Sequence, residues 1–100
     1  MNADGDAIAR MVSGYEPLLR GFITGTIPGD EFETTFIEYF KSDKAQVRSP
    51  ELDVINNVFY DVDEYVADPD LRARAGGPGD EWLRERLREA YRRLYGKECT

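Results

Sequence analysis

Carboxylates are concentrated in one stretch of this sequence, between Pro50 and Asp70. The stretch contains no lysine or arginine, and its seven acidic residues are Glu51, Asp53, Asp61, Asp63, Glu64, Asp68 and Asp70. A group of this kind is compatible with three kinds of chemistry: nucleophilic catalysis, calcium binding, and pairing with a basic partner.

The first two kinds of chemistry fit the sequence poorly. Phe59–Asp63 matches the apolar–Asp–x–Asp nucleophile motif of haloacid-dehalogenase-type phosphatases, but those enzymes need a preceding strand, a large α/β domain and a downstream lysine. A calcium loop beginning at Asp61 has Val66 where glycine is required, and Arg72 at its twelfth position. A carboxylate-only metal site needs acids from several helices, and the sequence shows no such convergence. We therefore expect no enzyme, no metal and no cofactor.

Composition excludes further classes of function. The 100 residues include 20 acidic and 13 basic side chains, no histidine and one cysteine, with a net charge of -7. A histidine-dependent nucleophile and an internal disulfide are therefore impossible, and Cys99 is expected to be a reduced thiol without a role. The negative charge opposes direct nucleic-acid binding. The sequence has no membrane-spanning run and no signal peptide, which predicts a cytoplasmic protein that does not bind membranes.

Helical periodicity organises the chain into four segments, at residues 6–24, 30–41, 50–67 and 81–95. Pro17 lies inside the first segment and predicts a kink or a restart after Ser13. The second segment has a core stripe of aromatic residues, Phe32, Phe36, Tyr39 and Phe40. These features predict an all-α fold, a compact antiparallel four-helix bundle, in one domain spanning residues 1–100 with an ordered core at about 6–95.

Residues at the helix ends support these boundaries. Ser49 and Pro50 form a start signal, with Ser49 as the N-cap and Pro50 at the first helical position. Asp80 is expected to cap the last helix, and Gly96 to close it. Trp82 is expected to pack against the preceding loop.

The third segment divides into two faces when its residues are placed at 100° intervals. The predicted core face consists of Leu52, Ile55, Phe59, Val62 and Val66. Nearly opposite lie Asp53, Asn57, Asp61, Glu64 and Asp68, with Tyr60 at the edge of this acidic row and Asp63 near the core boundary.

An acidic row on a helix is usually no more than a solvated face. Here, however, like charges three and four residues apart repel one another. Asp61, Asp63 and Glu64 also lie in the C-terminal half of the helix, where the helix dipole disfavours anions. Compensation must come either from the arginines of the last helix or from a basic partner, and the sequence alone does not separate these possibilities.

Three stretches of the sequence resemble the colicin-D-type immunity proteins. The first comprises Phe22–Ile27 and Asp30–Glu33, followed by Phe36 and Phe40; the second is Val58–Tyr65 followed by Asp68–Arg72; and the third is Leu83–Ala90. The order and spacing of these stretches carry the similarity, which covers about Leu18 to Leu94. Pro17, Pro28 and Gly29 depart from the pattern of the family, as does the 76–79 loop.

This resemblance implies a helical bundle that binds and blocks the nuclease domain of a cognate bacterial toxin, for colicin D a tRNA-cleaving ribonuclease. The acidic row would then imitate RNA phosphates in a basic active-site cleft. The expected partner-binding residues are Asp53, Asn57, Tyr60, Asp61, Glu64 and Asp68, and Asp63 is a structural residue or a secondary contact. The free protein is expected to be a monomer. The alternative is an acidic helical adaptor, or a nucleic-acid mimic that regulates a partner other than a toxin.

Overall fold

The computed structural model describes residues 3–65, 68–75 and 77–99. They form five helices: α1 (Ala3–Ile23), α2 (Gly29–Ser42), α3 (Pro50–Glu64), α4 (Pro69–Ala75) and α5 (Asp80–Tyr95). No strand occurs within these ranges. The all-α prediction is confirmed.

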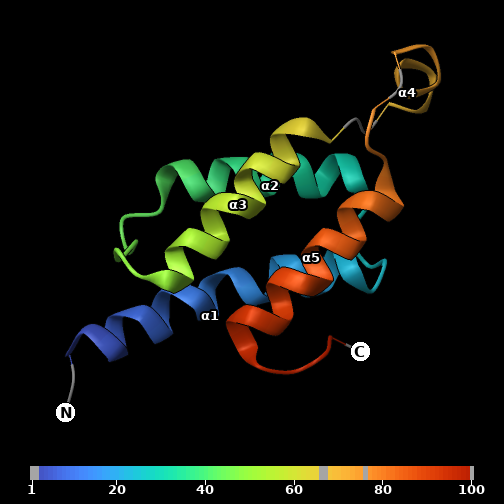
Figure 1. Cartoon of the computed structure of the whole chain (residues 1–100). Coiled ribbons are helices and arrows are strands. Elements are labelled where there is room, and N and C mark those ends of the chain that lie inside the picture. Colours follow the sequence, from blue (N-terminus) through green and yellow to red (C-terminus); the bar gives the residue numbers. More distant parts are fainter. Residues whose placement is uncertain (1–2, 66–67, 76, 100) are drawn as a thin grey trace.

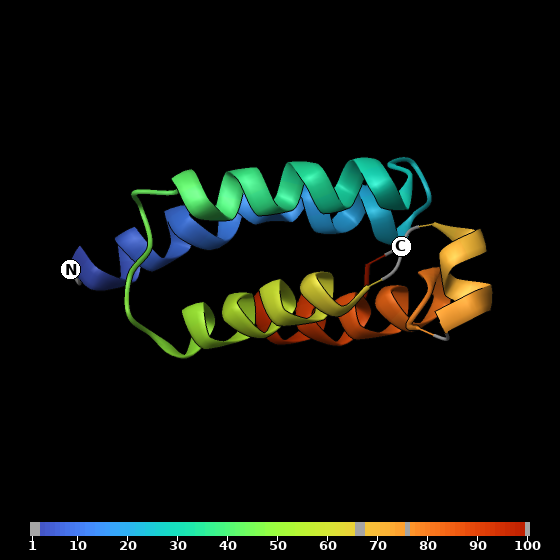
Figure 2. The ribbon, with the colours of Figure 1, turned by 90° about the horizontal axis from the view of Figure 1, so that it is seen from above.

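The four long helices form an antiparallel bundle. α1 packs against α2 and α5, and α3 packs against the same two helices. α2 and α3 therefore share one side of the bundle, above α1 and α5 in Figure 1. The short helix α4 lies beyond one end, between α3 and α5 in the chain (Figure 2). The predicted four-helix bundle is confirmed, and α4 is an addition that the periodicity did not predict.

Several predicted helix boundaries match the structure. The Ser49 Oγ accepts a hydrogen bond from the Leu52 N–H at 3.2 Å, with Pro50 at the first position of α3. Gly96 ends α5 with a φ of 70°, a left-handed conformation that glycine adopts at little cost. α1 continues through Pro17 as one helix, so of the two expected alternatives, a kink or a restart, the restart after Ser13 does not occur.

Two predicted boundaries differ from the structure. α3 ends at Glu64, because the Tyr65 N–H closes the helix onto the carbonyls of Asp61 and Val62. Val66, which was predicted to be in the core, lies outside the described residues. Gly79, and not Asp80, is the N-cap of α5, and the Asp80 carboxylate instead accepts the hydroxyl of Tyr65.

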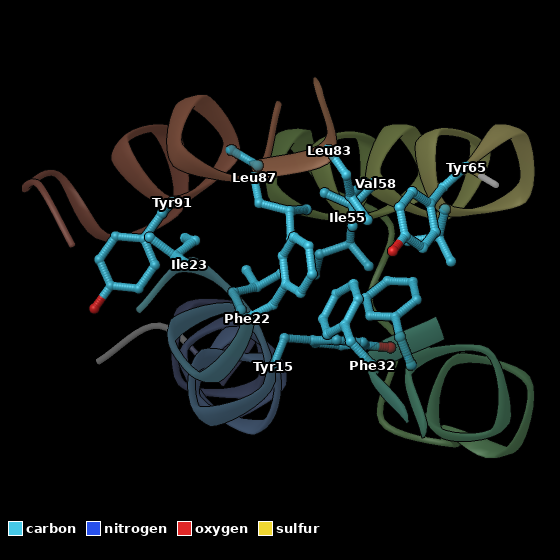
Figure 3. Close-up of a cluster of buried hydrophobic side chains, with 14 of the residues drawn as sticks. Tyr15, Phe22, Ile23, Phe32, Ile55, Val58, Tyr65, Leu83, Leu87 and Tyr91 are labelled. Atoms are coloured by element: carbon cyan, nitrogen blue, oxygen red, sulfur yellow. The ribbon is translucent and has the colours of Figure 1, made fainter. Parts of the chain in front are cut away.

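Aromatic side chains fill the centre of the bundle (Figure 3). The Phe22 and Phe32 rings stack with their centroids 5.1 Å apart, which joins α1 to α2. Phe40 and Phe59 stack at 4.6 Å and join α2 to α3. Tyr39 is 36% exposed and lies at the edge of the core stripe predicted for α2.

Buried tyrosines hold the helices together through their hydroxyl groups. Tyr15 donates to Asp43 Oδ2 at 2.8 Å, and Tyr91 donates to Glu16 Oε2 at 2.8 Å. A buried phenol needs an acceptor, since an unpaired hydroxyl costs about 1–3 kcal/mol. Burial, followed by the bond to Glu16, raises the pKa of Tyr91 to about 12.

We expect the Tyr91→Phe variant to lose less stability at alkaline pH than the wild type. The pKa of an unfolded tyrosine is about 10, so the stabilisation from the neutral phenol is complete below that pH and is lost as the pH rises through about 12. Melting temperatures measured from pH 8 to pH 12 test this expectation. Tyr60→Phe is the control, because the Tyr60 side chain is 64% exposed. Equal slopes for the wild type and Tyr91→Phe would contradict the assignment.

Candidate partner-binding surface

Four of the predicted binding residues form one row on the outer side of α3. Asp53, Asn57, Tyr60 and Glu64 follow at spacings of four, three and four residues, which places them one above another on a helix. All four are exposed, and Tyr60 is 64% exposed although it is a large aromatic residue. We call these four residues the α3 strip.

Asp61 lies beside the α3 strip and faces α5. The residue is only 9% exposed, so its predicted position on the solvent face is wrong. α5 packs against this side of α3 (Figure 1), and Arg86 Nη2 of α5 lies 3.0 Å from Asp61 Oδ1. The hydrogen bond to Asp61, followed by the charge of Asp61, raises the pKa of Arg86. For Asp61, the compensating charge therefore comes from within the molecule.

A groove of about 410 Å³ runs between α3 and α5 next to this ion pair. Its lining combines three apolar residues, one amide and five charged residues: Val54, Val58, Ala90, Asn57, Asp61, Glu85, Arg86, Glu89 and Arg93. Asn57 belongs both to the α3 strip and to the groove. Periodicity did not reveal the groove, because it depends on how two helices pack.

Asp68 does not continue the row. Helix α3 ends at Glu64, so the four-residue spacing no longer fixes the direction of Asp68. Its Oδ1 atom accepts hydrogen bonds from the backbone N–H groups of Asp70, at 2.9 Å, and Leu71, at 3.5 Å. Asp68 is exposed and stabilises the start of α4.

Asp63 lies on the opposite edge of α3 from Asp61, and it is exposed. Burial, followed by the charges of Asp30 and Asp63, raises the pKa of Glu33 on α2. The described residues include no hydrogen bond or ion pair of Asp63 that would hold α2 in place. Asp63 therefore adds negative charge where α2 and α3 meet.

The net negative charge of the helices comes from α2 and α3. α2 and α3 contain nine carboxylates and a single basic residue, Lys41. The other three helices contain eight carboxylates and nine arginines. In α5 the glutamates pair with arginines of the same helix: Glu81 with Arg84, Glu85 with Arg88, and Glu89 with Arg92 and Arg93. The contribution of α2 was missed, although its single basic residue is visible in the sequence.

Two findings on the described residues bear on the chemistry of this surface. Among them, no three His, Cys, Asp or Glu side chains gather in a group that could hold a metal ion. None of the helices, over the same residues, is long and apolar enough to cross a membrane. Exposed carboxylates beside an exposed tyrosine are suited to binding a basic protein surface.

Charge reversal at the two ends of α3 is expected to change stability in opposite directions. Asp63→Lys places a cation in a last turn that has no basic residue, and it also removes the repulsion of Glu33. It should stabilise the fold by about 0.3–1 kcal/mol. Asp53→Lys places the same charge in the first turn and should destabilise the fold by a similar amount. Urea unfolding of both variants tests this, and shifts in the same direction would contradict it.

Comparison with known proteins identifies the family of this chain. The family model described as bacterial self-protective colicin-like immunity matches residues 11–94, which include all of α2 and α3, α1 from Met11 onward, and α5 up to Leu94. Searches of curated proteins and of solved structures returned no significant match. Because the family model spans most of the sequence, the chain belongs to the bacterial self-protective colicin-like immunity family.

Proposed function

We propose that this chain is an immunity protein that inhibits the nuclease domain of a cognate toxin, and that the α3 strip binds in the basic active-site cleft of that domain. The single observation that carries the proposal is the α3 strip itself, an exposed row on a helix without any basic residue. Family membership supports a toxin as the partner. The resemblance to colicin-D-type proteins favours a tRNA-cleaving ribonuclease, and hence action in the cytoplasm.

The charge distribution supports inhibition by mimicry of RNA. A nuclease that binds RNA needs Lys and Arg side chains around its cleft to neutralise phosphates. Asp53 and Glu64 are 11 residues apart, or about 16 Å along the helix axis at a rise of 1.5 Å per residue. The two carboxylates at the ends of the α3 strip would pair with two separate cations of the cleft, and the helix between them would exclude the substrate. Opposite charges also accelerate association.

Tyr60 supplies the apolar part of the proposed contact. It lies between Asn57 and Glu64 in the α3 strip, and its ring is in edge contact with Phe59, with centroids 6.0 Å apart. Tyrosine at the centre of an interface is among the residues that contribute most to binding energy. The carboxylates around Tyr60 would then form a polar rim.

We expect Glu64→Lys to weaken toxin binding by about 10-fold or more, mainly through a slower association rate. The test measures growth of cells that express the nuclease domain of a toxin encoded beside this gene, and the affinity of the chain for an inactivated form of that domain. Asp6→Lys on α1 is the matched control, because it makes the same charge change at an exposed position on the other side of the bundle. Equal inhibition by both variants would place the interface elsewhere.

Tyr60→Ala should weaken binding about 30-fold, which corresponds to about 2 kcal/mol for a central tyrosine. Its melting temperature should stay near that of the wild type, since the side chain is largely exposed. The control is Leu71→Ala, which truncates another exposed apolar side chain, on α4, that is 48% exposed. A larger loss of affinity for Leu71→Ala than for Tyr60→Ala would move the contact to α4.

The second candidate function is an acidic helical adaptor or nucleic-acid mimic with a partner other than a toxin. The same acidic side of the bundle, formed by α2 and α3, favours it, because that side suits any basic surface. Protection of cells from the toxin excludes this candidate. Absence of binding to the toxin's nuclease domain, with the chain folded, supports it.

A further inference from the structure

We propose that the groove between α3 and α5 receives an arginine or lysine side chain of the basic partner, and that this cation takes the place of Arg86 at Asp61. The inference rests on the proposed function in so far as the partner is the toxin. In the free chain, Arg86 then occupies the position that the cation of the partner takes in the complex.

The shape of the groove matches a long cationic side chain. Val58 and Ala90, which are 2% and 6% exposed, form part of its lining together with Val54. Arginine and lysine bury their aliphatic stems on apolar surface and keep their charged groups among polar groups. The carboxylate of Asp61 supplies such a group here, and Glu85 and Glu89, which are paired with arginines of α5, also line the groove.

The charges of the groove favour a cation over an anion. Three carboxylates and two arginines line it. Glu85 and Glu89 are paired with other arginines of α5, so Asp61 is the carboxylate at which an outside cation can replace Arg86. Glu64 of the α3 strip adds to this field, since its charge contributes to the raised pKa of Arg86. An acidic side chain in the groove would be repelled by Asp61, whereas a cation there would pair with it.

The two residues of the Asp61–Arg86 ion pair differ in their freedom to move. The Asp61 side chain is 12% exposed, and the Arg86 side chain is 53% exposed. A poorly exposed carboxylate needs a cation at all times, because leaving it unpaired is strongly destabilising. Arg86, in contrast, can turn outward into solvent. In the free chain its guanidinium carbon also lies 5.5 Å from the centroid of the Trp82 ring, a cation–π contact beside the ion pair.

The groove is continuous with the proposed interface. Asn57 belongs to both, and its side chain is exposed at the edge where a partner bound to the α3 strip would approach. A partner that contacts Asp53, Tyr60 and Glu64 therefore has a basic side chain within reach of the groove without any change in the bundle.

The first experiment requires no toxin and uses a small probe. N-acetyl-arginine amide is titrated into the full chain and followed by two-dimensional NMR, with N-acetyl-citrulline amide as the uncharged isosteric control. We expect the arginine probe to shift the signals of Val54, Asn57 and Ala90, and to bind Arg86→Gln several-fold more tightly than the wild type. Arg86→Gln keeps a hydrogen-bond donor for Asp61 but removes the competing charge. Equal shifts with both probes, or shifts confined to other residues, would overturn the proposal.

The second experiment measures affinity for the inactivated nuclease domain. Arg86→Gln should bind about 3- to 10-fold more tightly than the wild type, because no internal cation has to be displaced. Arg20→Gln on α1 is the matched control, since Arg20 is also paired with a carboxylate, that of Glu16, and its side chain is 55% exposed. Weaker binding by Arg86→Gln would mean that Arg86 itself contacts the partner, and would overturn the exchange.

A third variant keeps the ion pair and fills the groove. Asn57→Trp covers the groove from its exposed edge, and the Asp61–Arg86 pair remains to hold α3 to α5. It should abolish the response to the arginine probe and weaken toxin binding. If the arginine probe occupies the groove but the toxin does not bind, the proposed toxin partner is wrong. If the toxin binds and Asn57→Trp has no effect, the groove proposal is wrong.

Discussion

One ion pair, Asp61 with Arg86, joins α3 to α5 beside the buried apolar side chains of the two helices. Helix α3 has five carboxylates and no basic residue, so it cannot neutralise its own charge as α5 does. Packing it into a bundle buries one side, and on that side Asp61 is the one buried charged residue within the described chain. A buried carboxylate is tolerated only with a partner. α5 supplies that partner from its exposed edge, which leaves the rest of α3 acidic.

This arrangement gives the two sides of the bundle different electrostatic properties. α5 pairs most of its arginines with its own glutamates, three and four residues apart, so it is close to neutral. Hydroxyl groups of buried tyrosines join α1 to the residues after α2 and to α5 without adding charge. Stacked aromatic rings then hold α2 and α3 against the core although both helices are acidic. Apolar packing thus compensates for the repulsion between the carboxylates of α2 and α3. A basic partner that binds this side would relieve the repulsion.

Much of the fold could be predicted from the sequence, because periodicity and helix ends are local properties. Ser49 and Gly96 show this, since each acts through its own backbone and the nearest turn. The prediction was wrong where two elements meet. Asp80 has the sequence of an N-cap but binds the hydroxyl of Tyr65, and Asp61 has the spacing of an exposed residue but faces α5. A helical wheel gives the direction of a side chain, whereas burial depends on which neighbour covers that direction.

The position of Asp61 also changes how the acidic surface is best understood. Had all the carboxylates of α3 been solvated, binding would consist of rim contacts, which mostly affect association rates. A poorly exposed carboxylate that already holds a cation offers a deeper contact, at which a partner's cation replaces an internal one with little loss of pairing. Such an exchange avoids most of the desolvation cost of a new buried ion pair, because Asp61 is desolvated in the free protein. The carboxylate that α5 neutralises in the free protein is therefore the one that the proposed partner would use.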